Sequence, residues 1–188
     1  MLKRIEESDK YVGITGFKGV KAEKPELLLK AIRSGKQTDV AVQFFNADLV
    51  ATWEHLYFAV VNALTAFDIH RNISKNLAIE VMLYASAQRQ IRKAIELLGL
   101  KPGCADVAVV VVAENPEAVE AALKSVSKHF SQKQEEHVLE LSPAKVQSVR
   151  RAFTITDEEM TVVTKNGDAN RALVDLVIER MALLSTRL

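Results

Sequence analysis

The chain has 188 residues, 48% of them hydrophobic and 26% charged, which is the composition of an ordinary folded protein and argues against disorder. Its formal net charge of +1 argues against a protein that coats long nucleic acids, because such binding requires many lysines and arginines on one face. A lone cysteine, Cys104, excludes an intramolecular disulfide and a zinc site built from thiolates of this chain alone.

Two strands are predicted near the N-terminus. Residues 11–17 carry β-branched and aromatic side chains between glycines, and residues 38–45 alternate apolar and polar positions. The spacing of Gly13, Gly16 and Gly19 matches neither the dinucleotide fingerprint nor the Walker loop, so we interpret these glycines as turns at strand ends. Between the strands, Pro25 is expected to open a helix over residues 26–33.

Three helices are predicted between residues 47 and 98. The first, over residues 47–67, is amphipathic, because apolar residues recur at steps of three and four: Leu49, Trp53, Leu56, Val60, Leu64 and Phe67. The second spans residues 77–85. The third is closed by Gly99 and is expected to turn one stripe inward, made of Ile91, Ala94, Ile95 and Leu98.

Polar residues gather between the second and third of these helices. The segment is also basic, since Glu80 is the one acidic residue between Arg71 and Lys93, against five cations: Arg71, Lys75, Arg89, Arg92 and Lys93. Cationic, aromatic and planar hydrogen-bonding side chains together are typical of sites that hold unpaired nucleotides. The alternative is that Ser86 caps the third helix and the cluster has only this structural role.

A central strand is predicted over residues 107–113, because this run is almost wholly apolar and β-branched and so suits a strand covered on both faces. It is far shorter than the roughly 20 apolar residues needed to cross a bilayer. No apolar secretory signal begins the chain, so we expect a cytoplasmic protein without membrane contact. Pro116 and Pro143 each follow a residue suited to an N-cap and are expected to open helices, whereas Pro102 follows a helix end.

The last helix, over residues 169–184, is apolar nearly all round, with several stripes interrupted mainly by Asp175, Glu179 and Arg180. A terminal helix of this kind is either buried deeply or shared with a partner. The sequence does not indicate which of these stripes faces inward. Trp53 and Tyr57 could extend the same surface, although core packing is the more ordinary role for Trp53.

Other candidate sites have simpler interpretations. The four histidines show no metal-ligand spacing and are expected to be solvated. Cys104 is read as a small buried thiol, because no activating base is evident beside it. The acidic run at residues 157–159 is read as a solvated helix start or turn. We expect no metal and no cofactor.

Two segments resemble a known family. The run SKNLAIEVMLYASAQRQIRKAI at residues 74–95, together with LVIERMALL at residues 176–184, is similar to the small accessory subunit of the KEOPS complex, the PRPK-binding protein (TPRKB) family. The likeness extends from the first strand to the last helix. It implies a non-catalytic subunit of the complex that makes threonylcarbamoyl-adenosine in tRNA, with a small atypical kinase as one partner and, for archaeal members, the single-stranded 3′ CCA end of tRNA as another.

This resemblance implies two sets of site residues. The tRNA 3′ end would be held by Lys75 and Arg89 at phosphates, by hydrogen bonds from four polar residues, and by the ring of Tyr84; the four are Asn76, Ser86, Gln88 and Gln90. The kinase would dock on the last helix, through Leu173, Leu176, Val177, Ile178, Arg180, Met181 and Leu184.

From these observations we expect one helix-rich α/β domain over residues 1–188, with a small central mixed or antiparallel sheet packed by helices. The alternatives are a kinase-binding scaffold that binds no RNA, and an α/β enzyme with a small-molecule pocket. The enzyme would need convergent titratable groups, and the sequence shows no such set.

Overall fold

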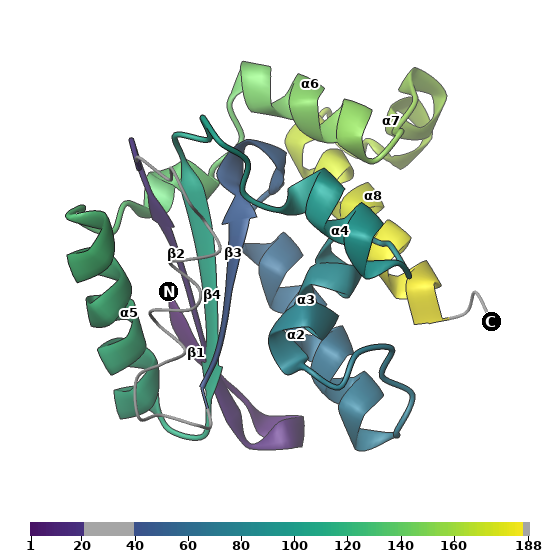
Figure 1. Ribbon diagram of the computed structural model, residues 1–188. Coiled ribbons are helices and arrows are strands. Elements are labelled where there is room, and N and C mark those ends of the chain that lie inside the picture. The colour runs from purple at the N-terminus through teal and green to yellow at the C-terminus, as the bar shows by residue number, and fades with distance from the viewer. Residues whose placement is uncertain (21–39, 186–188) are drawn as a thin grey trace.

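A four-stranded antiparallel sheet with helices on both faces organises the protein (Figure 1). The computed structural model describes residues 1–20 and 40–185. The strand order is β1-β2-β4-β3, with β1 Leu2–Ile5, β2 Lys10–Phe17, β3 Ala41–Asn46 and β4 Val107–Ala113. The helix-rich α/β class is confirmed, and of the two sheet types expected, the antiparallel one is found. The helix predicted over residues 26–33 and the first two residues of the second predicted strand lie outside the described residues.

Seven α-helices occur in the described parts of the chain: α2 Trp53–Asp68, α3 Leu77–Ala85, α4 Ile91–Leu98, α5 Pro116–Phe130, α6 Pro143–Ala152, α7 Asp157–Val163 and α8 Ala169–Ala182. Helix α5 covers one face of the sheet, and α2, α3 and α8 lie on the other side (Figure 1). Local signals set several helix starts. The side chains of Asn76, Asn115 and Ser142 cap α3, α5 and α6, and Pro116 and Pro143 occupy the first turns of α5 and α6.

Strand β4 lies between β2 and β3, and all of its residues are buried. Val110 and Val112 point into the larger core beside α2, α3 and α8, whereas Val109 and Val111 point into the smaller core beneath α5. Because both faces of this strand meet apolar layers, the sequence has no polar alternation. The prediction of a central, doubly covered strand is confirmed.

The first strand was not predicted. β1 pairs with β2 from Leu2 opposite Gly13 to Ile5 opposite Lys10, and Ile5 is its one buried residue. As a short edge strand carrying exposed charged residues, it lacks the apolar alternation by which strands are recognised.

The interpretation of Gly13 and Gly16 as turn glycines is wrong, because both lie inside β2. A Cβ atom at Gly13 would be 2.4 Å from Cγ1 of Val119, and one at Gly16 would be 2.7 Å from the carbonyl oxygen of Glu135. These glycines therefore allow α5 and the segment around Glu135 to pack directly on the sheet. Gly19, with φ of +65°, does occupy a turn conformation.

Candidate functional site

The α3–α4 junction is a tight turn. Helix α3 ends at Ala85. The amide of its C-cap residue Ser86 donates to the carbonyl of Met82 at 3.0 Å, and Ala87 follows in the left-handed region with φ of 52°. The amide of Gln88 then donates to the carbonyl of Leu83 at 3.1 Å, which satisfies another free carbonyl of the helix end. The turn therefore presents Gln88, Arg89 and Gln90 together ahead of α4.

Ser86 does not have the role that either sequence interpretation assigned to it. Its hydroxyl is buried and donates to the carbonyl of Leu83 at 3.1 Å, so it closes α3 instead of capping α4 or facing a ligand. The residue at the N-cap of α4 is Gln90, which makes no side-chain cap bond. The alternative prediction, that Ser86 caps α4, is therefore also wrong. The side chain of Gln90 is exposed at the surface.

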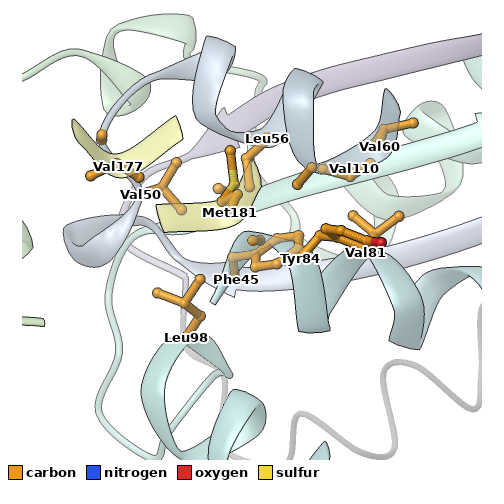
Figure 2. Close-up of a cluster of buried hydrophobic side chains, with 14 of the residues drawn as sticks. Phe45, Val50, Leu56, Val60, Val81, Tyr84, Leu98, Val110, Val177 and Met181 are labelled. Atoms are coloured by element: carbon orange, nitrogen blue, oxygen red, sulfur yellow. The ribbon is translucent and has the colours of Figure 1, made fainter. Parts of the chain in front are cut away.

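Tyr84 is likewise placed in the core. Its residue is 5% exposed, and its ring lies among the buried side chains of Phe45, Val81 and Met181 (Figure 2). Burial raises the pKa of the phenol, the carboxylate of Glu80 raises it further, and Arg89 acts in the opposite direction. The ring therefore has no free face on which a base could stack, and the RNA contact expected of Tyr84 does not fit its position in the core.

Glu80 holds the loop ahead of α3, a role that was not predicted from the sequence. Glu80 is fully buried, and its carboxylate accepts the amide hydrogens of Ile73 at 3.0 Å and Ser74 at 2.7 Å. A carboxylate that accepts backbone amides in this way orders the loop that carries Lys75. The available signal was an acidic residue inside an apolar helix, since a buried charge needs partners.

Lys75 and Asn76 lie at the start of α3 and are both exposed. The side-chain oxygen of Asn76 accepts the amide hydrogen of Ile79 at 3.1 Å and so caps the helix. Its NH₂ group is not used in that bond and can still donate. Lys75 has neither a cap role nor an ion pair among the described residues.

Arg89 connects the junction to the end of the last helix. It is exposed, and its Nη1 donates to the carbonyl oxygen of Leu184 at 3.4 Å. Leu184 belongs to the 3₁₀ turn Leu183–Ser185 that follows α8. The two surfaces expected from the sequence are therefore neighbours at this point, although they are 95 residues apart in the chain.

The inward stripe predicted for α4 is half wrong. Ala94 and Leu98 are buried, but Ile91 and Ile95 are 44% and 45% exposed. A short surface helix needs few inward positions, so these isoleucines remain outside. We call the exposed side chains here the α3–α4 surface: Lys75, Asn76, Arg89, Gln90, Ile91, Arg92, Lys93 and Ile95.

Helix α8 is apolar on several sides because this chain itself surrounds it. Five of the residues assigned to the partner interface are core residues, each at most 3% exposed: Leu173, Leu176, Val177, Met181 and Leu184. Figure 2 shows Val177 and Met181 directed toward Val50 and Leu56. These five side chains cannot contact a partner in this structure, so burial, the first of the two explanations for such a helix, accounts for them.

The remaining two assigned residues are half-buried. Arg180 forms an ion pair with Glu159 of α7, and Ile178 packs partly against the core. Glu159 also accepts the amide hydrogen of Thr156 in a capping box, and both bonds lower the pKa of its carboxyl, the Thr156 bond more strongly. The acidic run at 157–159 is thus a helix start, as expected. The exposed residues of α8 are Ala169, Asn170 and Arg171 in its first turn and Asp175, Glu179 and Ala182 further along, and the exposed Leu183 follows them.

His55 contradicts the expectation that the histidines are solvated. The amide of Ala51 donates to its Nδ1 at 3.2 Å, so Nε2 carries the proton and donates to the carbonyl of Ala85 at 2.8 Å. Complete burial lowers the pKa of this imidazole to about 4. His55 therefore ties the start of α2 to the last residue of α3, immediately before the α3–α4 junction.

Two classes of site find no support in the described ranges 1–20 and 40–185. No group of three His, Cys, Asp or Glu residues there could hold a metal ion. No helix within those ranges is long and apolar enough to span a bilayer.

Comparison with known proteins identifies related sequences. A family model described as "Kinase binding protein CGI-121" matches residues 17–185. The chain is also 29% identical over 145 residues to the "Regulatory protein Cgi121" of Methanocaldococcus jannaschii, in an alignment that covers 77% of this chain and 83% of that protein.

Proposed function

The chain belongs to the CGI-121 family of kinase binding proteins, and from this premise we propose that it is a non-catalytic regulatory subunit that binds a protein kinase and the 3′ CCA end of tRNA. The family match carries the first half of this proposal. The kinase would be the small atypical kinase of a KEOPS-type complex, and the supported reaction would be threonylcarbamoyl-adenosine formation on tRNA. The cytoplasmic location expected from the sequence stays a prediction.

The outward side of α8 supports the kinase contact. In the C-terminal half of α8 and the turn that follows it, the apolar side chains that reach the surface are those of Ile178, Ala182 and Leu183. Exposed apolar groups at a polar rim, here Asp175 and Glu179, are the common pattern of a protein interface. The proposed kinase surface is therefore the C-terminal end of α8 and the turn that follows it.

Placing a charge on this surface should separate the kinase. We expect Ala182→Glu and Leu183→Glu each to weaken binding at least ten-fold, about 1.4 kcal/mol, because each brings a carboxylate into an apolar contact. Affinity is measured by calorimetry with the purified kinase. Val162→Glu, at a residue of α7 that is 82% exposed, serves as the control and should bind normally. Unchanged affinity in both test variants would remove the kinase from this end of α8.

The α3–α4 surface supports the RNA contact by its chemistry. Lys75, Arg89, Arg92 and Lys93 are exposed there, and Arg92 pairs with Glu96 at 2.8 Å on the helix surface. Gln88, Gln90 and the NH₂ group of Asn76 add donors suited to base edges and ribose. A few cations suffice for a short single strand, whereas a long duplex would need many more.

Reversing the charge at residue 89 should weaken tRNA binding. We expect Arg89→Glu to cost about 1 to 3 kcal/mol, as for the loss of a charged hydrogen bond, and to leave kinase affinity within two-fold. Binding is measured by mobility shift with full-length tRNA and with tRNA trimmed of its CCA tail. Lys124→Glu on α5, across the sheet, makes the same change of charge and is the matched control.

Two results would contradict the RNA half of the proposal. Equal affinity for the full-length and the trimmed tRNA would show that the tail is not recognised. Equal losses in Arg89→Glu and Lys124→Glu would show that only total charge matters. In either case the protein would be a kinase-binding scaffold without specific RNA contact, which is the second candidate function.

A non-catalytic subunit of this kind would act by positioning. Holding the tRNA end beside the kinase raises the effective concentration of the RNA at the modifying subunits, without any bond chemistry in this chain. The neighbourhood of the two surfaces supports this role, because Arg89 of one and Leu184 at the end of the other are in direct contact.

A further inference from the structure

The outward side of α2 is uncharged between its two ends. Glu54 in the first turn and Asp68 at the last position are the acidic residues of this helix, and it contains no lysine or arginine. The side chains that reach the surface between them, and at the C-cap residue that follows, are Tyr57, Phe58, Val61, Asn62, Thr65 and Ile69. At 3.6 residues per turn these six residues form one stripe, which we call the α2 face.

Helix α5, which has nearly the same length, has a different outward side. Its exposed side chains carry charges at steps of three and four residues: Glu117, Glu120, Lys124 and Lys128. This is the usual pattern of a helix whose outward side meets only water. The α2 face lacks such charges over about three turns, and depletion of charged residues is the compositional mark of the centre of a protein interface.

Aromatic side chains gather in the N-terminal half of the α2 face. The ring of Tyr57 lies edge-on to the rings of Trp53 and Phe58, with centre-to-centre distances of 6.1 and 5.6 Å. Phe58 is 37% exposed, and Ile69 at the other end of the stripe is 56% exposed. On the opposite side of the helix, Leu56 packs into the larger core (Figure 2), so the exposed rings lie on a firmly held element. Aromatic groups of this kind often contribute most to the stability of an interface.

The two ends of the α2 face carry opposite charges that are incompletely paired. At the N-terminal end, Glu54 shares its countercharge, because Arg171 pairs with Asp175 as well. At the C-terminal end, His70 and Arg71 are exposed and form no ion pair within the described parts of the chain. A partner that fits this face therefore presents a cation to the first turn of α2 and an anion to its end.

A second copy of the chain meets both requirements. When two α2 helices pack antiparallel and cross near Val61 and Asn62, Phe58 of each copy faces Thr65 of the other. The first turn of each helix then lies beside residues 69–71 of the other copy. Antiparallel packing also places the positive end of each helix dipole beside the negative end of the other.

This arrangement brings opposite charges together at four places. Glu54 of each copy lies near Arg71 of the other, which gives two contacts. Asp68 of each copy lies near the first turn of the other helix, where the ammonium group of Lys3 sits 4.5 Å from the ring centre of Trp53. The α2 face is therefore complementary to itself in charge as well as apolar at its centre.

We propose that the α2 face is a homodimer interface, in which the α2 helices of two copies pack antiparallel about a two-fold axis near Val61 and Asn62. Phe58 and Ile69 supply the apolar contacts, and Glu54 with Arg71 of the other copy forms the polar rim. A helix of 16 residues is about 24 Å long, which places the interface at the low end of the size range. The dimer is therefore weak and reversible. None of these residues belongs to the α3–α4 surface or to the proposed kinase surface, so the inference does not rest on either.

Sedimentation equilibrium of the full chain, from low micromolar to near-millimolar concentration, tests whether the dimer forms. We expect a monomer–dimer equilibrium that Phe58→Glu and Ile69→Glu each weaken at least ten-fold, because a carboxylate then enters an apolar contact in both halves of the interface. Val162→Glu makes a similar change at an apolar residue that is 82% exposed on α7, and it should associate as the wild type does.

Disulfide formation tests the two-fold geometry. Cys104 is the one cysteine of the chain, so Cys104→Ser provides a background without thiols. In this background Asn62→Cys places a thiol close to the axis and should give a covalent dimer on mild oxidation, since a disulfide requires Cα atoms within about 7 Å. Thr65→Cys is the matched control, because residue 65 faces residue 58 of the other copy and its own equivalent lies too far away.

Each outcome decides the proposal. A chain that stays monomeric at every concentration overturns it, and so does a dimer that Phe58→Glu and Ile69→Glu leave unchanged at a wild-type melting temperature. Equal cross-linking of Asn62→Cys and Thr65→Cys contradicts the two-fold packing. If the wild type does not dimerise and Phe58→Glu weakens binding of the purified kinase, the α2 face belongs to the kinase and the homodimer is excluded. Failure of the dimer leaves the kinase and tRNA experiments above unaffected.

Discussion

Val177→Glu should unfold the protein under conditions in which the wild type is stable, with a loss of more than about 4 kcal/mol in the free energy of unfolding. Val177 is 0% exposed and packs inside the larger core. A carboxylate at this position would have no counterion and no room to reach water. Total stabilities of domains are about 5 to 15 kcal/mol, so a single such change removes much or all of the margin.

Urea unfolding followed by circular dichroism measures this loss directly. The matched control is Val162→Glu, the same change of residue type at an exposed site, which should alter the free energy of unfolding by less than about 0.5 kcal/mol. A folded Val177→Glu protein of normal stability that had lost only its kinase would show that residue 177 is a surface residue. The burial of α8 described above would then be incorrect.

The second large effect expected is a loss of stability in acid that depends on His55. Burial lowers the pKa of this imidazole from about 6.5 to about 4, so between these values the unfolded chain binds a proton that the folded protein does not. The contribution is therefore complete above pH 6.5 and is lost as the pH falls toward 4. Each pKa unit corresponds to about 1.4 kcal/mol, which gives a loss of about 2 to 3 kcal/mol between pH 7 and pH 4.5.

Burial is the main cause, the positive charge of Lys145 lowers the pKa further, and the geometry at Nδ1 also disfavours the charged ring. A protonated ring has a hydrogen on Nδ1 that would face the amide hydrogen of Ala51, whereas the Nε2 donation to Ala85 would persist. His55→Gln removes the titrating group, so the difference in unfolding free energy between pH 7 and pH 4.5 should be smaller in this variant than in the wild type. His129→Gln, at an exposed site, should leave that difference unchanged. Equal pH dependence in all three proteins would show that His55 is accessible to protons in the folded state.

Local signals accounted for much of the secondary structure. The bounds of α3 were predicted correctly, because Asn76 caps its start and the polar residues after Ala85 end it. Asn115 with Pro116 and Ser142 with Pro143 correctly predicted where α5 and α6 begin. These capping signals depend on residues within one turn of each other, so they mark a helix end whatever the helix packs against. A short edge strand such as β1 carries no equivalent local signal.

The direction in which side chains face was predicted less well. Ile91 and Ile95 were expected inside and lie outside, whereas Tyr84 was expected at the surface and lies inside. The α3–α4 surface nevertheless retains five of the seven residues assigned to RNA if the half-buried Gln88 is included with Lys75, Asn76, Arg89 and Gln90. Side-chain polarity correctly predicted that these charged and amide residues reach the surface. It could not predict whether Tyr84, an aromatic residue with one polar atom, would be exposed or buried.

By itself the sequence determined the helix-rich α/β class, the doubly covered central strand and the basic turn between α3 and α4, because each depends on composition, periodicity or capping within a few residues. Only the tertiary structure decided that α8 is enclosed by its own chain, that Glu80 and His55 hold the junction from within, and that Arg89 reaches the end of α8. Those facts depend on which distant segments share a core. Whether a side chain is buried depends on its neighbours in space. The type of a single residue does not show which distant residues those neighbours will be.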